Sequence, residues 1–557
     1  MATDNQPFFQ DPPQLTNTFE ADSALRFQLE RLFAPEQLAE IRPQLHELGE
    51  LAAGSLQTLA IEAERDVPEL VQYEAWGRRV DKVRISPAWR EIHRIGAEQG
   101  LMATAHEARL GWRSRLHQAA LIHLFGPSSA FVSCPYAMTD GAIAILKRYA
   151  DPELAARPLR HLLSRDPDQA WTSGQWMTEK EGGSDVSRST TTARREAGVW
   201  RLYGNKFFVS AVTAECALTL ANAQGTPGLS LFFVQPWNAD GTLRHITLRK
   251  LKEKLGTRAL PTAEIDLQGV EATLVGKPGD GVRLIATVLN LARFHNTLAA
   301  TGIMARALQL AKDYAGRRVA FGRPLIEQPL HLETLAGLQV EYEAGLAIAL
   351  RLAELIGKVE TRAASPLEAG ACRLLTPVAK LGTGKQVVRV ASEAIEAIGG
   401  MGYIEETGLP RLLRDAQVLP LWEGTTNVLS LDALRAIDRQ EALRPFLEDT
   451  LMRVAQVTTS ELDGAVKSVR TAVQTLGRHT ESMARGNRCD SEAAARRFAL
   501  GLFNTYAAAL LTEAANWEAT RGQSCRLTIA ARRWIGRGLT DLAVPDAQYR
   551  EESRLLL

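Results

Sequence analysis

Several stretches begin like familiar catalytic or nucleotide-binding motifs, and each of them is incomplete. The run that starts at Gly400 (Gly-Met-Gly) lacks the third glycine of a dinucleotide-binding loop and follows a predicted helix rather than a strand. Gly384-Lys385 is followed by glutamine, so the usual phosphate loop is absent, and His106-Glu107 has a leucine in place of the second zinc-binding histidine. We therefore expect neither a nicotinamide-type hydride site nor a metal site.

The composition is that of a folded, charge-balanced protein. The chain has 557 residues, of which 45% are hydrophobic and 23% charged, which suits a folded chain of several structural units with buried cores. Lys and Arg (65) nearly equal Asp and Glu (64), which excludes a strong overall attraction to nucleic acid or to an anionic membrane. The five cysteines form no CxxC pair, and we find no secretory signal and no apolar run suited to a bilayer. We expect a cytoplasmic protein with no membrane partner.

Four segments occur in a fixed order over about 250 residues and together carry a resemblance. They are residues 177–186 (MTEKEGGSDV), 204–210 (GNKFFVS), 317–322 (RRVAFG) and 397–427, which contains AIGGMG, LPRLLRD and WEGTTN. In this order, with a β-rich region between helical ones, the chain resembles the flavin-dependent acyl-CoA dehydrogenases over roughly residues 60–435. The run 68–81 (PELVQYEAWGRRVD) and the extra C-terminal helices are typical of the AidB-like, adaptive-response branch.

The resemblance implies that the first two segments bind FAD. The residues implied are Met177, Thr178, Gly183, Ser184, Phe208 and Ser210. Ser184 would reach the pyrophosphate, and Gly183 would allow close approach of the backbone. Phe208 stands where the family usually has tryptophan, and Ser210 stands where a threonine faces flavin N5. Phenylalanine still covers the ring and serine still donates a hydrogen bond.

The later segments match the part of the family that binds the adenosine end of FAD, partly across a subunit interface. The residues implied are Arg318, Phe321, Glu396, Gly400, Thr425 and Asn427. A planar guanidinium such as that of Arg318 suits a pyrophosphate, whereas Glu396 replaces the usual glutamine. A solvated helix end is the alternative reading of Arg318. Cofactor sites shared between chains predict a homotetramer, a dimer of dimers.

Glu423 matches the family's most common catalytic base. Desaturation of an acyl-CoA needs a base for the α-proton while the β-hydrogen leaves as hydride, and a buried carboxylate suits this task. The family's alternative base position is Ala292 in this chain. By analogy Arg293, Cys134 and Met138 contact the acyl-CoA, and for Arg293 a salt bridge on the helix face is a nearly equal alternative. The implied function is an FAD-dependent acyl-CoA dehydrogenase that passes electrons to an electron-transfer flavoprotein.

Two other functions remain open at this point: a DNA-associated protective flavoprotein with weak dehydrogenase activity, and a non-catalytic acyl-CoA binder. DNA binding would need phosphate contacts from the C-terminal zone. That zone is nearly charge-balanced, and its best candidates are Arg526, Arg532, Arg533 and Arg537. A solvated or subunit-facing helix is the alternative reading of these arginines.

The elements that hold these segments follow from the residue patterns. Helical apolar spacing gives way to a stretch rich in aromatic and β-branched residues, and long helices then return. We expect an N-terminal helical domain (1–170), a middle β-barrel or sandwich domain (171–281), a C-terminal four-helix bundle (282–439) and an extra helical domain (440–557). This is an α+β, acyl-CoA dehydrogenase-like fold, and its order argues against a Rossmann enzyme.

Turn residues predict where single elements end. One helix should run from 282 to about Arg317, and two more should fill 330–398 before a double glycine. Residues 198–210 should form two strands, with Gly204-Asn205 as the turn between them.

Overall fold

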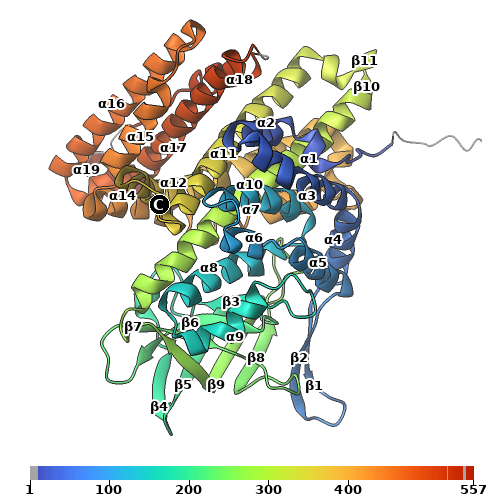
Figure 1. The fold of residues 1–557 in the computed structure, drawn as a ribbon, viewed down its shortest axis with the longest axis vertical. Helices are drawn as coiled ribbons and strands as arrows, with labels where there is room; N and C mark the ends of the chain where they lie inside the picture. Colours follow the sequence, from blue (N-terminus) through green and yellow to red (C-terminus); the bar gives the residue numbers. More distant parts are fainter. Residues whose placement is uncertain (1–10, 523–524, 543–546) are drawn as a thin grey trace, which may run out of the picture.

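The computed structural model describes residues 11–522, 525–542 and 547–557 and has the expected α+β architecture. N-terminal helices, a β barrel, a bundle of long helices and further C-terminal helices follow one another along the chain. In Figure 1 the barrel lies at the bottom, and the extra C-terminal helices lie at the upper left beside the long helices. One long helix runs diagonally from the barrel to the top of the molecule.

The N-terminal part is helical apart from one hairpin. Its helices are α1 (Thr18–Ala21), α2 (Ser23–Leu32), α3 (Pro35–Ala53), α4 (Ser55–Arg65), α5 (Pro87–Glu98), α6 (Ala103–Glu107), α7 (Arg113–Phe125), α8 (Ser133–Tyr149) and α9 (Pro152–Leu162). The antiparallel strands β1 (Glu69–Tyr73) and β2 (Arg79–Arg84) correct the expectation of helix throughout. Gln72 and Arg79 donate hydrogen bonds to the Leu248 carbonyl at 3.1 and 2.7 Å, which ties this hairpin to the barrel.

The middle part is a closed barrel. Its strands are β3 (Ser173–Trp176), β4 (Thr192–Glu196), β5 (Val199–Ser210), β6 (Cys216–Ala223), β7 (Leu229–Val234), β8 (Ile246–Leu251) and β9 (Thr262–Val275). The order β4-β5-β9-β7-β6 returns to β4, and β3 and β8 flank this ring. The predicted turn at Gly204-Asn205 is wrong: β5 is continuous there, and the turn is Ala197-Gly198. Gly204 is needed instead because a Cβ atom there would meet Thr191.

The predicted long helices are confirmed. They are α10 (Gly281–Arg317), α11 (Pro329–Glu360) and α12 (Pro366–Ile398), followed by the shorter α13 (Leu409–Ala416) and α14 (Thr426–Gln440). Ser365 and Glu368 form a capping box at the start of α12, and Gly399, with φ of +79°, ends it. Between α10 and α11 the chain makes a small hairpin from β10 (Val319–Ala320) and β11 (Arg323–Pro324).

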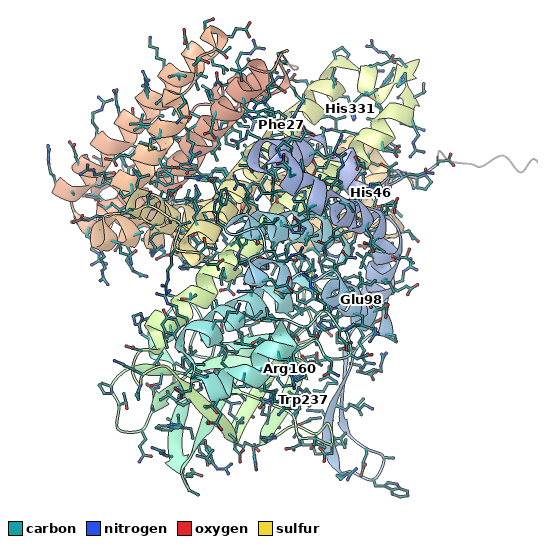
Figure 2. The ribbon with its side chains drawn as sticks, viewed as in Figure 1. Phe27, His46, Glu98, Arg160, Trp237 and His331 are labelled. Atoms are coloured by element: carbon teal, nitrogen blue, oxygen red, sulfur yellow. The ribbon has the colours of Figure 1, made fainter. Side chains whose placement is uncertain are left out.

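The extra helices pack directly on the bundle. They are α15 (Leu443–Ala455), α16 (Asp463–Arg485), α17 (Arg488–Ala519), α18 (Arg526–Ile535) and α19 (Ala547–Leu555). Helix α17 contacts α11, α12 and α14. Figure 2 shows Phe27 of α2 in the upper part of the molecule, and its ring meets that of Trp517 edge-on at 5.2 Å. The N-terminal and C-terminal ends of the fold therefore share an interface.

Most of the arginines considered as DNA contacts form ion pairs within the chain. Arg526, Arg533 and Arg537 pair with carboxylates of α11, which are those of Glu343, Glu333 and Glu341. Their common helical face therefore docks α18 onto α11, and it does not present three free guanidinium groups to a phosphate backbone. Arg532 is exposed and forms no ion pair within the described part of the chain.

Three further features concern the described residues alone. No helix in them is both long and apolar enough to span a bilayer. No group of three or more His, Cys, Asp or Glu side chains in these residues is placed to hold a metal ion. All five cysteines are free thiols.

Candidate active site

Glu423 lies on a tight turn between α13 and α14. Its φ of +55° and that of Gly424, +107°, both fall in the left-handed region. This conformation costs a residue with a side chain about 1–2 kcal/mol, so the surroundings must hold it. Arg293 Nε donates to the Glu423 carbonyl at 3.1 Å, and Lys380 Nζ donates to the Gly424 carbonyl at 2.6 Å. Two cations from α10 and α12 thus fix consecutive carbonyls of the turn.

Arg293 is itself held in place by a second contact. Its Nη1 lies 2.8 Å from Asp432 of α14, and Arg373 of α12 approaches the other oxygen of that carboxylate at 2.9 Å. The Arg293 guanidinium is buried and forms a salt bridge within this chain, although with Asp432 of another helix and not along the face of α10. A contact between Arg293 and a substrate stays a prediction.

The Glu423 residue is half-buried, and charged and polar groups from three other elements act on its carboxyl. Burial raises its pKa above the usual value, and this effect is opposed by Arg293, by a hydrogen bond from Gln175 and by Lys380. Gln175 Nε2 lies 3.5 Å from Glu423 Oε1, at the upper limit of a hydrogen bond. The neighbouring Trp422 ring packs edge-on against Phe131 at 5.8 Å. A carboxyl with a raised pKa on a fixed turn is chemically suited to accept a proton from carbon.

Cys134 and Met138 of α8, which are implied in substrate binding, differ in how far they are buried. Cys134 is half-buried and close enough to Glu423 and Lys254 to feel their charges; burial raises the pKa of its thiol to about 12. Met138 is buried one turn further along the helix. Both remain predictions as substrate contacts.

The residues predicted for flavin binding form a loop anchored at one end. Met177 is buried directly after β3, and the Thr178 carbonyl accepts a 2.9 Å hydrogen bond from the Phe207 amide of β5. Next in the chain, Glu179 is fully buried and pairs with Lys206 at 2.7 Å. Beyond this anchor the loop turns outward, and Gly183 and Ser184 are exposed, as one end of an extended ligand would require.

A ligand could approach this loop closely. The glycines of the loop and the exposed ring of Phe208 in the neighbouring strand β5 leave room for it. A Cβ atom at Gly183 would lie 2.7 Å from Thr178 Oγ1, so no side chain fits there. Phe208 is 51% exposed although it lies in a strand, and the Lys252 ammonium lies 4.5 Å from its ring centre. Ser210 is half-buried, 3.5 Å from Thr262. An exposed ring, hydroxyl groups and free backbone fit a planar heteroaromatic group that carries a pyrophosphate.

The structure does not bring the whole predicted flavin set together within one chain. Arg318 and Phe321 lie on the β10–β11 hairpin, where Phe321 is 98% exposed. Helix α10 separates this hairpin from the barrel, and its 37 residues span about 55 Å. Figure 1 shows the hairpin and the barrel at opposite ends of the molecule. One cofactor cannot reach both within a single chain.

The remaining residues of that set are also exposed. Glu396 and Gly400 lie at the end of α12, and Thr425 and Asn427 lie at the start of α14, just after Glu423. The Thr425 hydroxyl caps α14 by accepting a hydrogen bond from the Val428 amide at 3.4 Å. These roles toward a cofactor stay predictions.

Three residues of the site were missed in the sequence: Gln175, Lys254 and Lys380. Gln175 and Lys380 act on Glu423, and Lys254 acts on Cys134, each from a distant segment of the chain, so only the fold shows these interactions. A signal existed for Lys380, because it interrupts an apolar helical run between Ala379 and Leu381. A buried lysine in such a run is unusual without a specific partner.

Four family profiles match successive parts of the chain. They are the adaptive response protein AidB N-terminal domain (10–169), the acyl-CoA dehydrogenase middle domain (174–270), the acyl-CoA dehydrogenase C-terminal domain (279–438) and the acyl-CoA dehydrogenase 11 C-terminal domain-like family (441–555). Together with the barrel between helical parts, they define the class of protein. The chain belongs to the acyl-CoA dehydrogenase family. Members of this family are generally FAD-dependent oxidoreductases.

Particular relatives narrow the branch. Acyl-CoA dehydrogenase family member 11 of Caenorhabditis elegans is 40% identical over 558 residues, 96% of this chain and 90% of that protein. The putative acyl-CoA dehydrogenase AidB of Escherichia coli (strain K12) is 35% identical over 471 residues, 81% of this chain and 83% of that protein. The structure of Caenorhabditis elegans ACDH-11 in complex with C11-CoA has a TM-score of 0.94 and 37% identity, covering 99% of this chain and 96% of that one. The AidB-like assignment is confirmed.

Proposed function

We propose that this protein is an FAD-dependent acyl-CoA dehydrogenase with Glu423 as its base. The observation that carries the proposal is the half-buried Glu423, whose carboxyl has a pKa raised by desolvation and whose turn is fixed by two cations. The position of the family's other base is Ala292, which has no carboxyl group. The complex of ACDH-11 with C11-CoA supports an acyl-CoA as the ligand.

In this mechanism the chain's own residues bind, orient and move one proton. The Glu423 carboxylate removes the proton from the carbon next to the thioester carbonyl, and the turn keeps its oxygen aimed at that carbon. Bound FAD supplies the acceptor for the β-hydrogen, which leaves with its electron pair as the α,β double bond forms. Gln175 donates to Glu423 and limits the rotation of the carboxylate. Cys134 and Met138 would line the acyl chain.

The flavin would be held by residues of two subunits. Thr178, Gly183, Ser184, Phe208 and Ser210 would hold it from one chain. The hairpin at the far end of α10 would serve the site of a second chain, because it lies too far from its own barrel. This division supports a homotetramer built as a dimer of dimers, in which a partner copy completes each site.

Two further parts of the proposal concern where the protein works and where its electrons go. Reduced flavin must be reoxidised, and an electron-transfer flavoprotein is the acceptor we propose. Five free thiols suit a reducing compartment, which supports the cytoplasm.

The test is the visible spectrum of the purified protein, followed anaerobically while straight-chain acyl-CoAs of increasing length are added. We expect the flavin band to bleach with one range of lengths, and Glu423→Gln to slow bleaching at least about 100-fold. Glu441→Gln is the matched control, because Glu441 also has a positive φ, +49°, but is exposed at the other end of α14. Binding without bleaching would instead indicate an acyl-CoA binder. A colourless protein that cannot be reconstituted with FAD would refute the cofactor.

A further inference from the structure

Lys380 is a buried cation without a carboxylate partner of its own. It lies in α12 among apolar residues and is 1% exposed. Its Nζ donates to the Gly424 carbonyl at 2.6 Å, and in the described residues no carboxylate lies within ion-pair distance of it. Buried charges are normally paired, because removing an ammonium group from water is costly. The position of Lys380 beside the base therefore needs a reason.

Lys206 in the barrel shows what an ordinary buried lysine looks like in this fold. It is also 1% exposed, but Glu179 neutralises it at 2.7 Å. Lys380 has a carbonyl oxygen in place of that carboxylate. The nearest carboxylate to influence it belongs to Glu423, one residue before that carbonyl, and each of the two side chains affects the pKa of the other.

We propose that Lys380 is a positioning residue for the base: its ammonium group holds the Gly424 carbonyl, and its positive charge acts with that of Arg293 to favour the ionised form of the half-buried Glu423. This inference rests on the proposed function, in which Glu423 must be a carboxylate before it can accept a proton. The hydrogen bond fixes where the carboxylate points, and the charge favours its ionised form. The two roles are separable by substitution.

The other charged groups around Glu423 differ from Lys380 in their partners. Arg293 also favours the ionised Glu423 carboxyl, and more strongly than Lys380, but it is paired with Asp432 at 2.8 Å, and Arg373 approaches the same carboxylate. The Cys134 thiol, with its pKa near 12, is neutral under ordinary conditions. Lys254 is held by the Leu260 carbonyl at 2.6 Å, and burial lowers its pKa to about 8. Lys380 is therefore the cation that both contacts the turn and lacks a carboxylate of its own.

Burial also makes the charge of Lys380 dependent on pH. Desolvation lowers its pKa to about 7, with Arg293 acting in the same direction and Glu423 opposing it. Protonation of Lys380 favours the ionised base, and ionisation of Glu423 favours protonated Lys380. The two groups therefore titrate as a coupled pair.

Three substitutions separate the roles. Lys380→Met removes both the donor and the charge, Lys380→Gln keeps a donor without the charge, and Lys380→Arg keeps the charge. Lys312→Met is the control, because Lys312 lies at the far end of α10, where it binds Gln339, and burial also lowers its pKa. Glu423→Gln identifies the infrared band of the protonated Glu423 carboxyl by its disappearance.

The experiment is an infrared pH titration of the purified full-length variants, with anaerobic bleaching by undecanoyl-CoA measured in parallel. We expect the midpoint of the Glu423 band to rise by about one pH unit or more in Lys380→Met and Lys380→Gln, and to stay near wild type in Lys380→Arg and Lys312→Met. The acid limb of the bleaching rate should move with the midpoint.

The outcomes distinguish this inference from the proposed function. An unchanged midpoint in both uncharged variants overturns the role of Lys380, even if the wild-type flavin bleaches. A raised midpoint in a protein whose flavin never bleaches keeps the role of Lys380 and refutes the dehydrogenase. If Lys380→Met does not fold, Lys380→Gln decides by the same criterion.

Discussion

The buried pair of Glu179 and Lys206 should anchor the predicted flavin loop, and its removal should be costly. Glu179 begins the loop after β3 and is 2% exposed, while Lys206 lies in β5 and is 1% exposed. Besides the 2.7 Å ion pair, the Glu179 carboxylate accepts hydrogen bonds from the Thr190 amide at 2.6 Å and the Thr191 hydroxyl at 2.6 Å. One carboxylate thus joins the segment after β3 to β5 and to the residues that lead into β4.

The pKa of Glu179 gives the size of its contribution to the free energy of unfolding. Burial alone would raise it, but Lys206 and the hydroxyl groups lower it from 4.5 to about 2. At ~1.4 kcal/mol per pH unit, this difference corresponds to about 3 kcal/mol of stability. Because the folded pKa is depressed, this stabilisation is present above pH 4.5 and is lost as the pH falls towards 2. The value of about 3 kcal/mol agrees with the loss of about 3–5 kcal/mol that is typical when one partner is removed from a buried ion pair.

The assay is urea unfolding followed by tryptophan fluorescence, to which Trp176 and Trp200 of the barrel contribute among the ten tryptophans of the chain. At pH 7 we expect Glu179→Gln and Lys206→Met each to lose about 3 kcal/mol, and the double variant to regain more than half of the summed loss, because no buried charge is left unpaired. The deficit of Glu179→Gln should shrink as the pH approaches 2. Additive losses in the double variant, or a deficit that does not depend on pH, would refute this account.

Two further substitutions test how the extra helices are attached. Gly382→Ala should destabilise the protein by about 1–3 kcal/mol, because the new Cβ would overlap the Phe503 ring, whereas Gly464→Ala, with nothing within 4 Å, should be neutral or stabilising; urea unfolding measures both. Arg526→Ala should cost about 2 kcal/mol by leaving the 3% exposed Glu343 carboxylate without its cation, whereas Arg532→Ala should change little. Equal effects within either pair would contradict the packing described.

The long helices could be predicted because residues close to each end of a helix mark where it begins and stops. Ser365 with Pro366 starts α12 and Gly399 ends it, and these signals act over a few residues. The two errors arose where local signals mislead. The local sequence at Gly204 predicts a turn, but Gly204 lies within the continuous strand β5. A glycine is needed there because a side chain would collide with Thr191. The hairpin β1–β2 sits within a stretch of helices and takes its support from the carbonyl of Leu248, far along the chain.

The site was predictable to the extent that its residues fall in contiguous motifs. Glu423 and the loop at 177–184 belong to such motifs. Gln175, Lys254 and Lys380 do not, because their importance comes from contacts between segments that lie far apart in the sequence. The same reason explains Arg526: its spacing resembles a basic surface, and only the packing of α18 on α11 shows that its charge is matched.

The extra C-terminal helices are part of the structure that holds the turn at Glu423. Helix α14 begins three residues after Glu423 and packs on α17, so movement of α17 is transmitted to the end of the turn. Helix α12 carries Lys380, and two residues later Gly382 lets the Phe503 ring of α17 approach its backbone. The helix that follows the turn and the helix that carries Lys380 therefore both pack on α17. From this geometry, an overpacked contact at Gly382 should disturb the Lys380 hydrogen bond as well as stability, and the infrared midpoint of Glu423 would detect that change.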